Sequence, residues 1–62
     1  MKKLKLIRIS KRLTMKELGK MVGVTGLTIY RYESGTRKPN IDLALKIAGI
    51  LEVPVEELFK DV

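Results

Sequence analysis

The sequence predicts an all-α protein, a bundle of five short helices that forms a single domain over residues 1–62. Two observations favour this class. Apolar residues recur at helical spacing in five segments, each bounded by a capping residue, a glycine or a proline, and strand-like alternation is absent over any useful length. With 62 residues, the chain is also too short for a second domain.

The first helix is expected over about residues 2–12. Its apolar stripe consists of Leu6, Ile9 and Leu13, flanked by Leu4 and Ile7. Thr14 ends this run and begins the next helix. Thr14 and Glu17 have the spacing of a capping box, in which the side chain of each residue bonds to the backbone amide of the other.

The second and third helices are expected to lie close together in the chain. The second buries Leu18, Met21 and Val22 and ends at Gly23. The third starts from Thr25 as its N-cap, turns Ile29 and Tyr32 inward and stops at Gly35. The three intervening residues include a glycine, so the two helices must meet at a steep angle, as in a helix-turn-helix.

A loop over residues 35–40 separates these helices from two more. Asn40 is a suitable N-cap for the fourth helix. The expected inner residues of that helix are Ile41, Ala44, Ile47, Ala48 and Leu51. A short fifth helix begins at Pro54, and its apolar stripe consists of Val55, Leu58, Phe59 and Val62.

Charge is unevenly distributed along the chain. Residues 1–38 contain eleven lysines and arginines and two acids, a net charge of +9, whereas residues 39–62 contain two bases and five acids, a net charge of −3. The total is +6. A directed field of this kind attracts a polyanion such as nucleic acid to one side of the molecule, although an ordinary solvated basic surface would give the same composition.

The composition also argues against several classes of protein. Without cysteine or histidine, the chain lacks disulfides and the usual zinc ligands and nucleophile–base pairs, so we expect no enzyme activity, metal or cofactor. No segment approaches the ~18 apolar residues of a membrane span, and the basic first helix has no bulky aromatic anchor for a membrane surface. No small-molecule ligand is evident, and a cytoplasmic location is expected.

The sequence resembles a known family, the lambda-repressor and Cro-like (Xre-type) helix-turn-helix domains, over residues 6–59. The motifs that carry the resemblance are Leu6-Ile7-Arg8, Thr14-Met15-Lys16-Glu17-Leu18, Gly23-Val24-Thr25, Thr28-Ile29-Tyr30-Arg31-Tyr32-Glu33-Ser34-Gly35, Arg37-Lys38-Pro39 and Leu51-Glu52-Val53-Pro54. The resemblance implies a lambda-repressor-like five-helix bundle in which helices two and three form the helix-turn-helix. It also implies that the third helix, about residues 25–34, enters the DNA major groove.

Sequence is read in the major groove by side chains near the start of such a helix. The candidate base contacts are Thr25, Gly26, Leu27, Thr28, Tyr30 and Arg31. Arg31 is the strongest, since a guanidinium donates twice to guanine. Gly26 and Leu27 depart from the family, which often has polar, amide-bearing residues there. Either the site is read mainly through Arg31, Thr28 and Tyr30, or the domain discriminates bases poorly.

Phosphate contacts are expected from the start of the second helix and from the loop after the third. The candidates are Lys11, Arg12, Thr14, Met15, Lys16, Ser34, Thr36, Arg37 and Lys38. Arg12 occupies a position where the family often has glycine. Arg8 and Glu33 are expected to form a structural ion pair across the bundle, as at the matching positions of the family.

The function predicted from these features is sequence-specific binding of double-stranded DNA by a transcriptional regulator, with repression the expected mode. A homodimer on a pseudo-palindrome is expected, because paired half-sites multiply the affinity of one small module. The stripe of the fifth helix, Val55, Leu58, Phe59 and Val62, is its candidate surface. The alternative is a protein-interaction module of antitoxin type with weak or secondary DNA binding.

Overall fold

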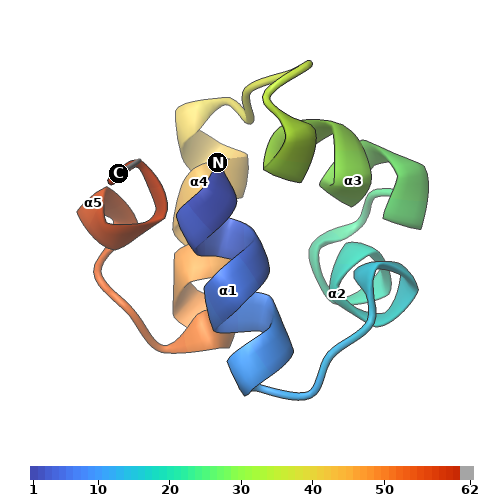
Figure 1. Ribbon diagram of the computed structural model, residues 1–62, viewed down its shortest axis with the longest axis horizontal. Helices are drawn as coiled ribbons and strands as arrows, with labels where there is room; N and C mark the ends of the chain where they lie inside the picture. The colour runs from blue at the N-terminus through green and yellow to red at the C-terminus, as the bar shows by residue number, and fades with distance from the viewer. Residues whose placement is uncertain (61–62) are drawn as a thin grey trace.

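The structure, a computed structural model, describes residues 1–60 and consists there of five helices. In chain order they are α1 (Lys2–Ser10), α2 (Met15–Val22), α3 (Gly26–Ser34), α4 (Ile41–Leu51) and α5 (Val55–Leu58). Figure 1 shows α2 and α3 on one side of α1, with α5 on the other. The predicted all-α, five-helix architecture is confirmed.

The ends of α2, α3 and α4 are set by local sequence signals. Thr14 and Glu17 form the expected capping box: the Thr14 amide donates to Glu17 Oε1 at 2.9 Å, and the Glu17 amide donates to Thr14 Oγ1 at 3.0 Å. Asn40 caps α4, since its Oδ1 accepts from the Leu43 amide at 2.8 Å. Gly23 and Gly35 end α2 and α3 with φ near +85° and +83°, in the left-handed region that glycine adopts without steric cost.

The core draws on all five helices. The largest fully buried side chains are Leu4, Leu18, Ile29, Ile47, Leu51 and Leu58. Val22, Tyr32, Ala44 and Ala48 are also buried, so the inner faces predicted for α3 and most of those predicted for α2 and α4 are confirmed. None of the helices in residues 1–60 has the length or the apolar run needed to span a bilayer.

The predicted inner face of the first helix is wrong. Leu6 and Ile9 are exposed, and Leu4 is the fully buried residue of α1. The buried face follows Met1, Leu4 and Arg8, so its third member is a charged residue that an apolar pattern overlooks. The helix also ends at Ser10, two residues earlier than expected, because Arg12 adopts a left-handed backbone with φ +59°.

Two further residues placed in the core by their spacing lie at the surface, Met21 of α2 and Ile41 of α4. Each lies at the edge of its helix's apolar stripe, where the neighbouring elements leave it uncovered. A small domain leaves some of its large apolar side chains exposed, since a chain of this size buries only about 60% of its unfolded surface.

The last helix is shorter than its predicted stripe. α5 ends at Leu58, and Val62 lies outside the described residues. Leu58 is fully buried, Val55 packs against the core, and Phe59 is exposed. The expected dimer surface is therefore corrected for Leu58, because a side chain that fills the core has no surface to offer a partner.

Candidate nucleic-acid interface

The turn between α2 and α3 depends on a glycine that sequence analysis missed. The Val24 amide donates to the Gly19 carbonyl at 2.8 Å, which holds the turn against α2. A Cβ atom at Gly19 would lie 2.6 Å from the Val24 oxygen and 2.9 Å from the Thr25 carbonyl carbon. Only glycine fits at this distance, and the available sequence signal was a glycine inside an otherwise regular helix.

The face of α3 opposite the core carries three of the candidate base contacts. Leu27 and Tyr30 expose 57% and 53% of their surface, and Arg31 is also exposed. Ile29 and Tyr32 lie in the core, as expected from their spacing. Because α3 buries one side only, its other side is available along its length to a groove that admits a helix.

The two threonines at the start of α3 satisfy each other. Thr25 Oγ1 accepts from the Thr28 amide at 3.2 Å, and the two hydroxyl oxygens lie 3.0 Å apart. Thr25 is therefore the N-cap of α3, the first role expected for it. Thr28 is half-buried, so less of it faces outward than of the neighbouring Leu27.

Gly26 lies at a close contact between the start of α3 and the start of α2. A Cβ atom at Gly26 would be 3.1 Å from the Cα and amide nitrogen of Lys16, so the glycine allows the starts of the two helices to pack tightly. An open hollow of about 430 Å³ lies beside this contact and is lined by Lys16, Lys20, Val24, Thr25 and Gly26. Close packing accounts for the glycine at this position, where the family often has a polar side chain that contacts a base.

The loop after α3 folds back over the end of the helix. The Arg31 carbonyl accepts from the amides of Thr36 and Arg37 at 3.0 and 3.2 Å and from Ser34 Oγ at 3.2 Å. The hydroxyls of Ser34 and Thr36 are 3.0 Å apart. These bonds bring the candidate phosphate contacts of the loop next to Arg31, the strongest candidate for reading a base.

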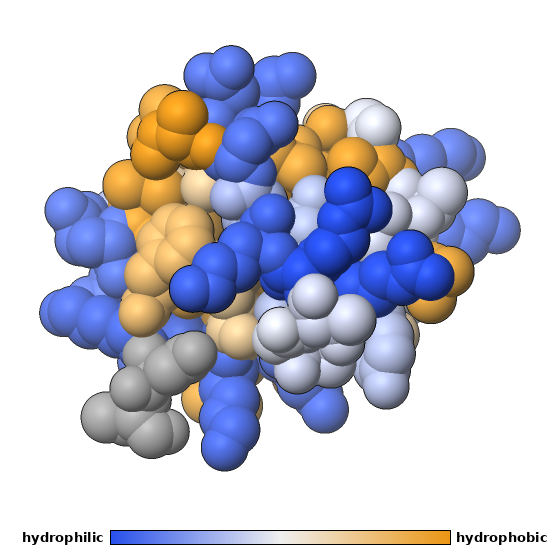
Figure 2. Space-filling view, turned by 90° about the horizontal axis from the view of Figure 1, so that it is seen from above, coloured by the Kyte–Doolittle hydropathy of each residue, from blue (hydrophilic) through white to orange (hydrophobic). Residues whose placement is uncertain are grey.

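The cations at the two ends of α3 are free of carboxylate partners. Arg31, Arg37 and Lys38 are exposed at its end, and Lys16 is exposed beside its start. In residues 1–60, none of the four forms an ion pair. Figure 2 views the molecule from above, and its most hydrophilic side chains lie near the centre of this face, with apolar side chains beside them.

The remaining phosphate candidates differ in the contacts that they make within the protein. The side chain of Met15 packs against the core, so Met15 offers its amide, one of the first amides of α2, which have no partner within the helix. Lys11 Nζ lies 3.9 Å from Glu52 Oε1 at the surface, whereas Arg12 is exposed and unpaired in the described part of the chain. Thr14 accepts from the Glu17 amide but keeps its own hydroxyl proton to donate.

Glu17 is an acid that lies among these phosphate candidates, in the first turn of α2. The hydrogen bond from the Thr14 backbone amide, together with contact to the Thr14 side chain, lowers the pKa of Glu17 below its ordinary value of 4.5. Its negative charge lies in the first turn of α2, where it complements the positive end of the helix dipole.

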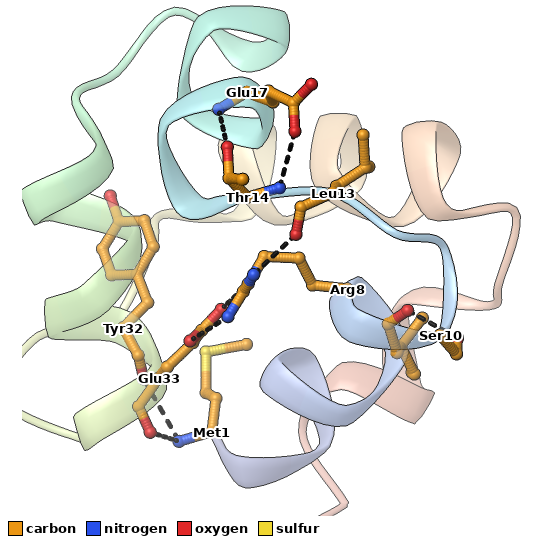
Figure 3. Close-up of polar contacts among 9 residues, drawn as sticks. Met1, Arg8, Ser10, Leu13, Thr14, Glu17, Tyr32 and Glu33 are labelled. Atoms are coloured by element: carbon orange, nitrogen blue, oxygen red, sulfur yellow. Dashed lines mark hydrogen bonds and ion pairs between the residues drawn. The ribbon is translucent and has the colours of Figure 1, made fainter.

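Arg8 and Glu33 lie inside the bundle, away from the exposed face of α3. Arg8 Nε is 2.6 Å from Glu33 Oε2, and Arg8 Nη2 is 3.3 Å from Glu33 Oε1. Arg8 Nη1 also donates to the Leu13 carbonyl at 2.6 Å. Figure 3 shows the guanidinium between these two acceptors. The arrangement joins α1, the end of α3 and the segment that leads into α2.

The amino group of Met1 gives a second support for the end of α3, which sequence analysis also missed. It donates to the carbonyls of Tyr32 and Glu33 at 3.2 and 3.5 Å (Figure 3). A positive charge at the carbonyl end of a helix is favourable because it opposes the negative end of the helix dipole.

The sequence pattern of the helix-turn-helix family matches residues 4–58. The chain belongs to this family. The helix-turn-helix itself is formed by α2, the turn at Gly23 and α3, in agreement with the predicted lambda-repressor-like arrangement.

Relatives of this helix-turn-helix chain cover nearly its whole length. It is 40% identical over 57 residues to an uncharacterized HTH-type transcriptional regulator of Methanocaldococcus jannaschii, covering 92% of this chain and 86% of the relative. An uncharacterized HTH-type transcriptional regulator of Archaeoglobus fulgidus is 37% identical over 57 residues, 92% of this chain and 80% of its own. The cryptic phage CTXphi transcriptional repressor RstR of Vibrio cholerae is 32% identical over 95% of this chain and 53% of its own length. No solved structure gives a significant match.

Proposed function

We propose that this helix-turn-helix domain binds double-stranded DNA in a sequence-specific manner and regulates transcription, with repression as its mode. One observation carries the proposal. The exposed face of α3 has unpaired cations at both of its ends, Lys16 beside its first turn and Arg37 and Lys38 beside its last. Repression is favoured by the similarity to the phage repressor RstR.

The exposed face of α3 suits the major groove. The groove is about 12 Å wide and admits an α-helix, whose outward side chains then meet the base edges. Arg31 is exposed and unpaired in the described residues, so its guanidinium is available to donate to N7 and O6 of a guanine. Tyr30 and Leu27 flank it on the same face, and Thr25 and Thr28 lie at the start of α3.

The cations beside α3 suit the two DNA strands that border the groove. The start of α2 offers Lys16 and the amide of Met15. The segment just before α2 adds Lys11, Arg12 and Thr14. The loop offers Ser34, Thr36, Arg37 and Lys38. Contacts of this kind fix the position of a protein on the duplex without reading its sequence, and they make its affinity strongly dependent on salt.

A homodimer on two half-sites is part of the proposal. One domain of this size offers a small DNA interface, and half-sites about one helical turn apart would add the contacts of a second copy. Ile41 and Leu45 of α4 and Phe59, directly after α5, are exposed apolar residues, and α4 and α5 pack together. These three residues would form the contact. Phe59→Glu should then shift sedimentation to the monomer without loss of helical circular dichroism. The compartment of action is the one that holds the DNA, the cytoplasm.

Selection of preferred duplexes from a random pool, followed by binding measurements at several salt concentrations, tests the proposal. We expect a defined half-site, and the logarithm of affinity should fall linearly with the logarithm of salt. Arg31→Ala should lose the preference at one base position. Arg37→Ala with Lys38→Ala should reduce the salt slope by about two, whereas the control Lys46→Ala with Lys60→Ala, both in the acidic part of the chain, should leave it unchanged.

The proposal fails if selection yields no preferred sequence and the affinity for duplex DNA does not depend on salt. Capture of a polypeptide with an affinity insensitive to salt would point instead to a protein-interaction module.

A further inference from the structure

We infer that the first turn of α3 reads DNA through an apolar contact: Leu27 contacts the C5-methyl group of a thymine, about two base pairs from a guanine bound by Arg31. This inference rests on the proposed function and names the half-site chemistry that α3 recognises.

The start of α3 offers few polar groups to a base, because its two hydroxyls bond to each other and leave one hydroxyl proton to donate. The hydroxyls of Thr25 and Thr28 lie 3.0 Å apart, and Thr25 Oγ1 also accepts the Thr28 amide. Gly26 has no side chain, and its backbone is packed against Lys16. None of these three residues presents an amide or guanidinium group to a base, so the first turn lacks the side chains that form paired hydrogen bonds with adenine or guanine.

Leu27 is the large side chain that this turn does present. More than half of its surface, 57%, is exposed, although removing a leucine side chain from water is favourable. Among the base edges of the major groove, the C5-methyl group of thymine is the apolar feature. Leu27 therefore matches thymine, and a cytosine at the same position would offer no methyl group.

The distance between Leu27 and Arg31 sets the order of bases. The two residues are four apart on one helix, so their side chains lie on the same face and are separated by about 6 Å along the axis. Successive bases on a strand are about 3.4 Å apart. With α3 lying along the groove, a thymine read by Leu27 and a guanine read by Arg31 are about two base pairs apart.

Uracil tests this contact because it differs from thymine only by the missing methyl group. In the selected duplex, each thymine would be replaced by uracil in turn and the dissociation constant measured by fluorescence anisotropy. We expect one position at which uracil weakens binding about fourfold, the effect of one buried methyl group at about 0.8 kcal/mol. Leu27→Ala should bind the thymine duplex at least about fourfold more weakly than the parent protein does. It should no longer distinguish uracil from thymine at that position.

A matched control separates this effect from a general loss of apolar surface. Leu6 of α1 is exposed to a similar extent, 63%, and Leu6→Ala should bind like the parent and retain the full uracil effect. For Arg31, 7-deazaguanine should weaken binding at a guanine about two base pairs from that thymine, and Arg31→Ala should abolish this sensitivity.

The outcomes distinguish the inference from the proposed function. If selection gives a defined half-site but uracil has no effect at any position, or Leu27→Ala still distinguishes uracil, the methyl contact is wrong and DNA binding stands. If no duplex is preferred and binding is independent of salt, the proposed function fails and this inference fails with it.

Discussion

The guanidinium of Arg8 is shared between the carboxylate of Glu33 in the last turn of α3 and the carbonyl of Leu13 just before α2. Arg8 and Glu33 expose only 7% and 8% of their surface, and no buried side-chain nitrogen or oxygen in the described residues lacks a hydrogen-bond partner. Both elements of the helix-turn-helix are therefore tied to α1 through one arginine.

Removing one partner of this pair should be costly, because the other charge would stay buried without compensation. Glu33→Ala is expected to lower the free energy of unfolding by about 3–5 kcal/mol, measured by urea denaturation followed by circular dichroism. The double variant Arg8→Met with Glu33→Leu removes both charges and should recover a large part of that loss. A double variant less stable than Glu33→Ala would mean that the bond from Arg8 to Leu13 matters more than the ion pair.

The boundaries of α2, α3 and α4 could be predicted because the groups that set them are local. The capping bonds of Thr14, Thr25 and Asn40 each join residues three apart. The inner face of α1 could not be predicted in this way. It includes Arg8, whose burial depends on Glu33, 25 residues further along the chain.

In the candidate interface too, features set within one helix could be predicted and contacts between helices could not. The period of α3 places Ile29 inside and leaves Leu27 and Arg31 outside, as predicted. The close contacts at Gly19 and Gly26 are distances between α2 and its neighbours, which no pattern within one helix encodes. The role of Gly26 is therefore visible only once the two helices are placed together.

Protonation of Glu17 should weaken the start of α2. The pKa of Glu17 is lowered by its bonds to Thr14, so the folded protein binds this proton less readily than the unfolded chain. The resulting stabilisation is fully present above pH about 4.5 and is lost as pH falls through the lower pKa of the folded state.

Urea denaturation between pH 6 and about pH 3 would measure this contribution by comparison with Glu17→Gln. The glutamine oxygen can still accept from the Thr14 amide but does not titrate, so the variant should lose less stability than the parent as the solution is acidified. Parallel curves for the two proteins would show that Glu17 gives no pH dependence to folding.

Two glycines inside helices should respond to alanine with opposite signs. At Gly19 the new methyl group would lie 2.6 Å from a backbone oxygen, so Gly19→Ala should lower the free energy of unfolding by about 1–3 kcal/mol. At Gly49 of α4 a Cβ would meet nothing within 4 Å, and Gly49→Ala should raise it by about 0.5–1 kcal/mol. Thermal denaturation of the two variants measures both effects. A Gly19→Ala variant as stable as the parent would show that the turn can move away from α2.

Arg12 and Glu52 share an uncommon backbone conformation and so form a matched pair for the last prediction. Each has φ of +59°, which is costly for a side chain with a Cβ, and glycine should relieve part of that cost. Arg12→Gly and Glu52→Gly are each expected to raise the free energy of unfolding by up to about 1 kcal/mol. Because Arg12 is a candidate phosphate contact, Arg12→Gly should reduce the salt slope of DNA binding by about one. Glu52→Gly removes a carboxylate beside Lys11 and should not reduce the slope. Denaturation with urea and binding titrations at several salt concentrations measure the two effects separately. Equal slopes for the two variants would show that Arg12 does not contact DNA. Arg12→Gly would then change only the stability of the domain.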